Sequence, residues 1–225
     1  MTTSTSVTDP NRIEALKQLN ILDTPTEEAF DRLTRLASKI IDAPVSLISI
    51  VDADRQFFKS LFGLPDPWAS NRETPLSHSF CQYVVDTSEP LIVSDAREHP
   101  QLKDNLAIPD LDVIAYLGMP LTTTTGVELG SFCVIDNKPR EWTEREIEIV
   151  RELALSTMTE IELRQEVKAR KEAEDLLIER NNQYRRAYFF AGKTLQFMKE
   201  VIAKGTSEEE LASYVAQMER ELSRL

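Results

Sequence analysis

The segment from Ala43 to Asp136 constrains the fold of this chain more than any other part of its sequence. An alternating apolar run over residues 45–51 leads into the polar turn Asp52-Ala53-Asp54, and a second run over residues 56–61 follows. Two such runs joined by an Asp-rich turn are typical of a β-hairpin. The segment therefore predicts a sheet that begins with two antiparallel strands.

The rest of this segment supplies further strands. A short apolar run covers residues 91–93, and two longer runs over 114–121 and 129–135 flank a Thr-rich turn that ends in Gly126. This order of elements predicts an α+β fold with an antiparallel sheet and helices on both faces. Residues 62–112 are available to cover one face, and folds of this kind usually enclose a small-molecule pocket.

Helix signals flank the predicted sheet. Thr24-Pro25-Thr26-Glu27 combines a capping hydroxyl with a proline and a glutamate, and apolar residues at helical spacing follow as far as Ile41. Thr143-Glu144-Arg145-Glu146 forms a second capping box, which predicts a long helix through Ile161. We expect this helix to continue, because residues 163–188 contain neither proline nor glycine.

Three parts can be separated along the chain. Residues 1–10 are rich in Thr and Ser and are expected to be disordered, residues 11–165 form one domain, and residues 166–225 form a charged helical tail. Gly205 predicts a helix end, and Thr206-Ser207-Glu208-Glu209 predicts the start of a last helix. Two seams for a coiled coil are possible in this tail, and neither is a clean heptad. The first consists of Leu163, Val167, Arg170, Glu174, Leu177, Asn181 and Tyr184. The second consists of Ala169, Ala173, Leu176, Arg180, Gln183, Ala187 and Phe190.

Composition excludes several classes of protein. A net charge of −12 argues against a nucleic-acid partner, because phosphate binding needs clustered Lys and Arg. No run of 18 apolar residues and no secretory signal is present, so we expect no membrane insertion and a cytoplasmic location. The two cysteines, Cys81 and Cys133, lack any Cys-x-x-Cys spacing, so neither a disulfide framework nor a zinc site is expected.

Several short motifs occur in an order that resembles a known family. They are DRQFFKS at 54–60, Arg72–Pro75, Ser79–Cys81 and GSFCVIDNKPREWTERE at 130–146. Over residues 11–165 the chain resembles a bacterial GAF domain, of the subgroup found as the N-terminal sensor module in histidine kinases and diguanylate cyclases. The resemblance implies a sensor of a small molecule or chromophore that dimerises through its flanking helices and signals along its exit helix.

The sequence lacks motifs that other groups of this family carry, and these differences limit which ligand or activity is expected. Residues 104–118, where bilin-binding members carry the attachment cysteine, contain no cysteine, so a covalently held bilin is not expected. The Asn-Lys-x-Phe-Asp-Glu signature of cyclic-nucleotide-binding members is also missing from the sequence. Free methionine sulfoxide reductases of this family use several cysteines, and this chain has two. The identity of a cofactor stays open.

The expected ligand site lies between the sheet and residues 62–112. Arg72 is the best placed of several basic residues for an anionic ligand, and Trp68 and Phe58 could stack on a flat one. Buried apolar and small polar residues would complete a concave site. The predicted ligand-binding residues are Phe58, Trp68, Arg72, Phe80, Cys81 and Tyr116.

Each reactive side chain also has a structural explanation. Cys81, near a helix start, could have a lowered pKa and act as a redox sensor, but free cysteines more often pack in the core. His78 is more readily explained as a surface or capping residue than as a catalytic base. Arg55, Lys59 and Arg97 could also contact an anionic ligand, although isolated basic residues in an acidic protein usually form surface ion pairs.

No complete catalytic constellation is recognisable, so we predict a sensor and not an enzyme. The leading hypothesis is a regulatory module that senses an unknown small molecule, forms a homodimer, and acts on a kinase or cyclase output domain. One alternative is a thiol-dependent enzyme such as a free methionine sulfoxide reductase. The other is a scaffold without a ligand that holds helices together.

Overall fold

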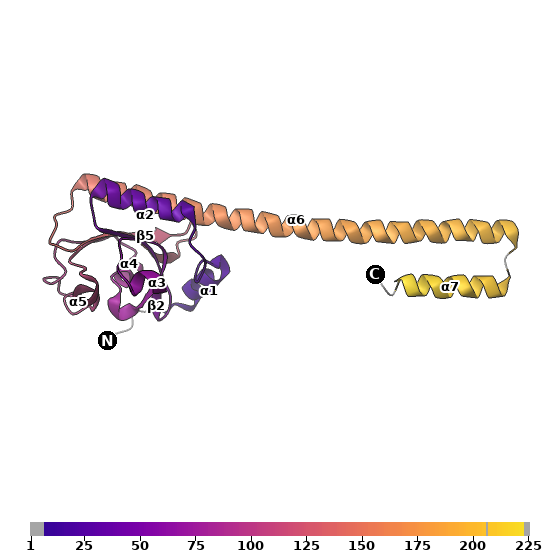
Figure 1. Cartoon of the computed structure of the whole chain (residues 1–225), viewed down its shortest axis with the longest axis horizontal. Coiled ribbons are helices and arrows are strands. Elements are labelled where there is room, and N and C mark those ends of the chain that lie inside the picture. The colour runs from indigo at the N-terminus through magenta and orange to yellow at the C-terminus, as the bar shows by residue number, and fades with distance from the viewer. Residues whose placement is uncertain (1–6, 206, 223–225) are drawn as a thin grey trace. The chain divides into compact units, whose positions relative to one another are not determined.

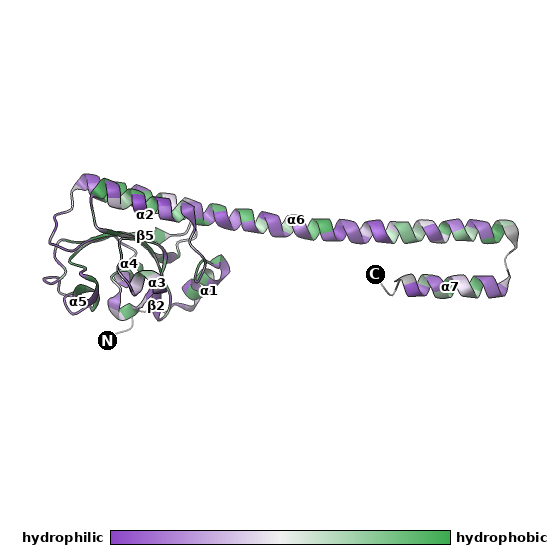
Figure 2. Ribbon diagram, viewed as in Figure 1, coloured by the Kyte–Doolittle hydropathy of each residue, from purple (hydrophilic) through white to green (hydrophobic). Residues whose placement is uncertain are grey.

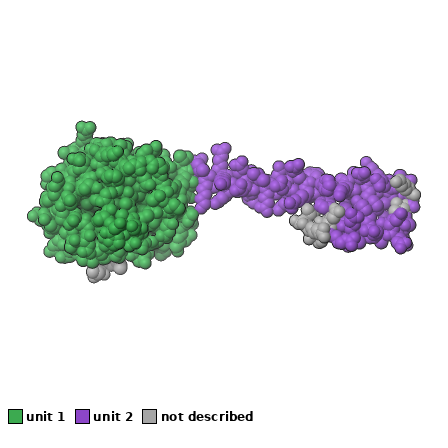
Figure 3. Space-filling model, viewed as in Figure 1, with its two compact units in different colours: residues 1–165 green, residues 166–225 purple. Residues whose placement is uncertain are grey.

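The computed structural model describes residues 7–205 and 207–222 and divides into two compact units, Met1–Gln165 and Glu166–Leu225 (Figure 3). Unit 1 contains an antiparallel sheet with helices on both faces, and unit 2 is helical (Figure 1). The predicted α+β fold with a long C-terminal helix is therefore confirmed.

The sheet of unit 1 has the strand order β3-β2-β1-β6-β5-β4, and all neighbouring strands within the described residues are antiparallel. Its centre is formed by β1 and β6, and both are almost wholly buried because helices cover both faces. The strands are β1 (Val45–Val51), β2 (Arg55–Phe62), β3 (Glu73–Pro75), β4 (Leu91–Val93), β5 (Ala115–Thr122) and β6 (Glu128–Asp136).

Long helices cover one face of this sheet. Figure 1 shows α2 (Glu28–Ile41) beside the first turns of α6 (Glu144–Lys204). Leu16 of α1 (Pro10–Leu19) packs into the same apolar core. Apolar residues at helical spacing on α2 and α6 pack against sheet residues that include Ile48 and Phe132. This face forms a continuous apolar core of fully buried side chains.

Short elements cover the opposite face. They are α3 (Trp68–Asn71), the 3₁₀ turn η1 (Leu76–His78), α4 (Cys81–Thr87) and α5 (Ala107–Leu111). Their buried residues form a second cluster on the sheet side that carries Leu47, Phe58, Tyr116 and Cys133. The expectation that residues 62–112 cover this face is confirmed by the elements that they form.

The long strands agree with the predicted runs to within one residue, but the start of α2 was predicted too early. Its N-cap is Glu27, and no side chain caps it, because the hydroxyl of Thr24 donates to the carbonyl of Ile21 instead. The second predicted capping box is present: the backbone N–H of Thr143 donates to Glu146 at 2.7 Å.

Of the segment predicted to be disordered, residues 1–6 lie outside the described residues. Val7 is buried in the domain.

Unit 2 contains the rest of α6 and α7 (Glu208–Leu222). Gly205 ends the first helix with a positive φ of 66°, and Ser207 caps the second through Glu210. Thr206, expected to take part in this cap, lies outside the described residues. Apolar and charged residues alternate along this part of α6 (Figure 2). None of the helices in the described ranges is long and apolar enough to cross a membrane.

Candidate functional site

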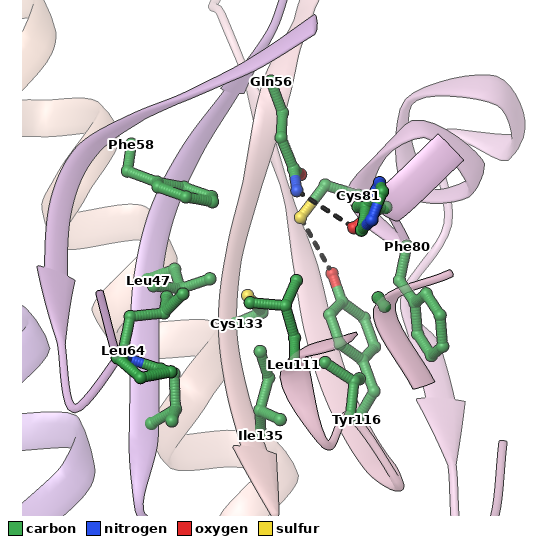
Figure 4. A pocket seen from close by; sticks show the side chains of 15 residues that line it. Leu47, Gln56, Phe58, Leu64, Phe80, Cys81, Leu111, Tyr116, Cys133 and Ile135 are labelled. Carbon is green, nitrogen blue, oxygen red and sulfur yellow. Dashed lines mark hydrogen bonds between the residues drawn. The ribbon is translucent and has the colours of Figure 1, made fainter. Parts of the chain in front are cut away.

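An interior cavity lies between the sheet and the short helices that cover its second face (Figure 4). Strands β1, β2, β5 and β6 supply its floor, and α4, α5 and the segment after β2 supply its cover. The cavity has a volume of about 30 Å³, which is room for roughly one or two water molecules. Its lining consists of Val45, Leu47, Gln56, Phe58, Leu64, Pro65, His78, Phe80, Cys81, Ala107, Leu111, Val113, Tyr116, Cys133 and Ile135.

Tyr116 and Cys81 form the polar centre of this cavity. Figure 4 shows the tyrosine hydroxyl facing the cysteine sulfur, at 3.3 Å, and the same hydroxyl lies 3.1 Å from Ser131 Oγ. The tyrosine ring can lie along β5 because Gly118 has no side chain; a Cβ there would stand 2.4 Å from the Tyr116 hydroxyl. The glycine therefore allows the contact between strand and helix.

The thiols and the phenol differ in acidity. Hydrogen bonds from Cys133 and then Tyr116 lower the pKa of Cys81, against the effect of burial, which raises it. Burial is the main reason why the pKa values of Tyr116 and Cys133 are raised. The three groups therefore form one hydrogen-bonded set at the centre of the cavity.

Gln56 and His78 are cavity-lining polar residues that the sequence did not indicate. Gln56 Oε1 accepts hydrogen bonds from Ser79 and Ser49, at 2.8 and 3.1 Å. His78 was expected at the surface, but it is 9% exposed, because its ring packs 5.1 Å from that of Trp68. Its Nε2 lies 3.0 Å from a carboxylate oxygen of Asp110 on α5.

The predicted ligand-binding residues separate into two groups. Phe58, Phe80, Cys81 and Tyr116 line the cavity. Trp68 packs on the outer side of His78. Arg72 lies beside a shallow groove between α2 and β2, where it donates to the carbonyl oxygens of Thr24, Phe58 and Lys59.

The buried polar side chains of the interior are hydrogen-bonded within the protein. Among the described residues, no buried side-chain nitrogen or oxygen lacks a hydrogen-bond partner. No group of three or more His, Cys, Asp or Glu side chains in the same residues could hold a metal ion. The cavity is therefore a mainly apolar site, with polar groups that already bind one another.

A second polar cluster lies on the other side of β2. Lys59 has a fully buried side chain, and its ammonium donates to Thr24 Oγ1 at 2.8 Å, to Pro25 O at 2.9 Å, and to the Glu27 carboxylate. Glu27 also lies 3.3 Å from Arg164 Nε on α6. Burial lowers the pKa of Lys59, while the hydrogen bond with Glu27 opposes this change. The cluster connects β2, the start of α2 and the exit helix.

Comparison with known proteins agrees with this fold. The family model described as "GAF domain" matches residues 25–161, and the chain belongs to the GAF family. A GAF domain of a phosphoenolpyruvate-protein phosphotransferase from Coxiella burnetii is 20% identical, with a TM-score of 0.55, covering 71% of this chain and 97% of that one. A domain of a putative two-component sensor histidine kinase from Sinorhizobium meliloti is 19% identical, with a TM-score of 0.54, covering 64% and 97%. These two structures show the fold.

A curated relative corrects one prediction. A protein named "Cyclic di-GMP phosphodiesterase" from Pseudomonas aeruginosa is 35% identical over 146 residues, which is 64% of this chain and 24% of that protein. The prediction that the chain is a sensor and not an enzyme is contradicted by this relative, because the matching segment occurs in a protein named as an enzyme. The chain spans about a quarter of the length of this relative.

Proposed function

We propose that the chain is a regulatory GAF module that senses a small molecule in bacterial signal transduction and passes a ligand-dependent change along α6. Family membership and the sensor-type structural neighbours support the signalling role. The observation that carries the proposal is the position of β2 between the cavity and the Lys59 cluster. In this proposal the site is formed by the cavity-lining residues Phe58, Phe80, Cys81 and Tyr116.

The path from the cavity to α6 is short. Phe58 lines the cavity, and its neighbour Lys59 points to the opposite face, because successive side chains of a strand alternate. Lys59 binds Glu27, and Glu27 pairs with Arg164 one residue before the end of unit 1. A ligand that moves Phe58 shifts the ammonium of Lys59 and thereby the hydrogen bonds that hold α6.

The proposed active form is a homodimer. The first of the two predicted seams continues at the same spacing beyond Tyr184, and its apolar members are solvent-exposed in the single chain, to 65% at Leu177 and 81% at Ile202. In unit 2, α7 packs through Tyr214 against Phe197, on the side of α6 opposite this seam. A second copy would bury the seam. Polar seam residues such as Asn181 would fix the register.

An enzyme is the proposed output. The relative of which this chain covers a quarter is named a cyclic di-GMP phosphodiesterase. A kinase or a cyclase would fit the same arrangement, in which the tail continues the exit helix towards the output domain. In this proposal the chain works in the cytoplasm.

The small volume of the cavity supports a second candidate, a scaffold without a ligand. A space of about 30 Å³ is far below the roughly 300–1,000 Å³ of ordinary ligand pockets. Native mass spectrometry of freshly purified protein, before and after incubation with the low-mass fraction of a bacterial extract, distinguishes the two. The sensor proposal expects a dimer that carries a bound small molecule; a dimer without any added mass under both conditions would favour the scaffold.

A further inference from the structure

We propose that the cavity accepts an uncharged, largely apolar small molecule, and that α5 is the cover which moves when this molecule enters. The inference rests on the proposed sensory function and names the chemical class of its ligand. It excludes cyclic nucleotides and other anions from this site. Three features of the cavity carry it: the chemistry of its described lining, the absence of Lys and Arg from that lining, and the way α5 is attached.

The lining offers apolar surface and few free hydrogen-bonding groups. Leu47, Phe58, Leu64, Leu111 and Ile135 surround the space with carbon atoms (Figure 4). The polar groups that reach it are engaged within the protein, as the pairs Gln56–Ser79, His78–Asp110 and Cys81–Tyr116 show. A polar ligand would have to break these pairs, and an unpaired buried polar group costs about 1–3 kcal/mol.

An anion would find neither Lys nor Arg among the described residues that line this space. The nearby cations Lys59 and Arg72 are bound by Glu27 and by backbone carbonyl oxygens on the other side of β2. Burying an unpaired phosphate there is strongly unfavourable.

The present volume requires that the cover moves. The α5 helix has five residues, of which Ala107 and Leu111 line the cavity. It is attached to η1 by the His78–Asp110 contact of 3.0 Å and by the Leu106 N–H, which donates to Ser77 O at 3.1 Å. Because the Asp110 side chain is 51% exposed, its contact with His78 contributes at most about 1 kcal/mol. These two polar contacts, the hydrogen bond from Asn105 to Ser79 O and the apolar packing of α5 on the cavity side are what an outward movement of α5 must break.

The test uses indole as the uncharged probe and cyclic GMP as the anionic one, in titrations of the full chain by calorimetry and methyl NMR. Indole should bind and shift the methyl signals of Leu47 and Leu111, whereas cyclic GMP should not bind. Leu111→Ala enlarges the cavity and should tighten indole binding about tenfold. The matched control is Leu106→Ala, which shortens an exposed leucine beside the same helix and should leave the affinity unchanged.

The role of α5 is tested by kinetics. Asp110→Asn removes the charge that faces His78 and should speed indole association several-fold in stopped-flow measurements, whereas the nearby exposed Asp112→Asn should not. Equal rates in both variants would overturn the proposed movement of α5.

The results of these experiments also show whether the ligand class alone fails or the proposed sensory function fails with it. Binding of cyclic GMP in the cavity in place of indole would overturn the ligand class and leave the sensory function standing. Equal tightening by Leu111→Ala and Leu106→Ala would place the indole site elsewhere and overturn the inference. If neither probe binds the native chain or Leu111→Ala, the cavity is not a ligand site, and the proposed function fails with it.

Discussion

The two units of this chain differ in how far their apolar side chains are buried. In unit 1 most of them are buried, with Phe30, Phe58 and Phe132 at most 1% exposed. The exceptions on its long helices include Leu36, Ile40 and Leu155. In unit 2 residues of the same kind stay in solvent, with Tyr188 at 76% and Leu177 at 65%. A domain that buries most of its apolar side chains can fold as a monomer. A long helix with an exposed apolar seam needs another surface to cover that seam. The contrast supports the proposal that unit 1 carries the recognition and that unit 2 carries the association.

The largest effect should come from the core of unit 1. Phe132→Ala leaves a cavity between the sheet and the long helices and should lower the free energy of unfolding by about 3–5 kcal/mol. Tyr188→Ala should change it by no more than about 0.5 kcal/mol. Both tryptophans, Trp68 and Trp142, lie in unit 1, so their fluorescence during urea unfolding reports on that unit. Equal losses in both variants would contradict the contrast between the units.

The next effect concerns the seam of the tail. Leu177→Glu places two charges at the contact between copies and should weaken the dimer on the order of a hundredfold. Ile178→Glu introduces the same charge at an adjacent, similarly exposed residue outside both predicted seams and should leave the dimer intact. Sedimentation or light scattering across a concentration series measures both. A native chain that remains monomeric at high micromolar concentration would remove the basis of this prediction.

A smaller effect is expected at the Lys59 cluster. Lys59→Met keeps the length of the side chain but removes the hydrogen bonds with Thr24, Pro25 and Glu27, and should lower the free energy of unfolding by about 1.5–3 kcal/mol. Lys39→Met, on the exposed face of α2, is the control and should have little effect.

The pH dependence of these variants has a defined sign. Since burial lowers the pKa of Lys59, the unfolded chain binds its proton more tightly than the folded chain does. The contribution of Lys59 to stability should therefore increase as the pH rises from its lowered pKa towards the ordinary value of 10.5, and Lys59→Met should lack this increase. Urea unfolding of both proteins in that pH range measures the difference, and parallel curves would contradict it.

The smallest effect should occur at the cover of the cavity. Asp110→Asn weakens one partly exposed contact with His78 and should change the free energy of unfolding by no more than about 1 kcal/mol. Thermal unfolding monitored by circular dichroism is sufficient to measure it. A loss of several kcal/mol would mean that α5 is an integral part of the core and cannot act as a movable cover.

The sequence predicted the elements that have a strong period. The strands of the hairpin, the closing strands and the long exit helix appear where alternation and capping placed them. The short α3 and α5 could not be predicted in this way, since four or five residues contain too little of a helical period. The start of α2 was misplaced because the Thr24 hydroxyl donates to the carbonyl of Ile21 and accepts a hydrogen bond from Lys59, 35 residues away, instead of capping the helix.

The site was only partly predictable for a related reason. Aromatic and small residues after β2 suggested a cavity wall, and Phe80 and Tyr116 do line the cavity. The burial of His78 and Lys59 depends on partners far apart in the sequence, Asp110 and Glu27, which no local pattern identifies. The volume of a cavity is a small difference between the space enclosed by the backbone and the volume that the side chains fill. Only the packed structure therefore defines it.

The most direct test of the account is amide hydrogen exchange along α6, measured with and without saturating indole. The account predicts that binding changes exchange both in the cavity strand at 56–59 and around Arg164 in the native chain. In Lys59→Met, indole should still bind, but the change around Arg164 should disappear. A response confined to the cavity residues, or one of equal size around Arg164 in Lys59→Met, would contradict transmission from the cavity through the Lys59 cluster to the exit helix.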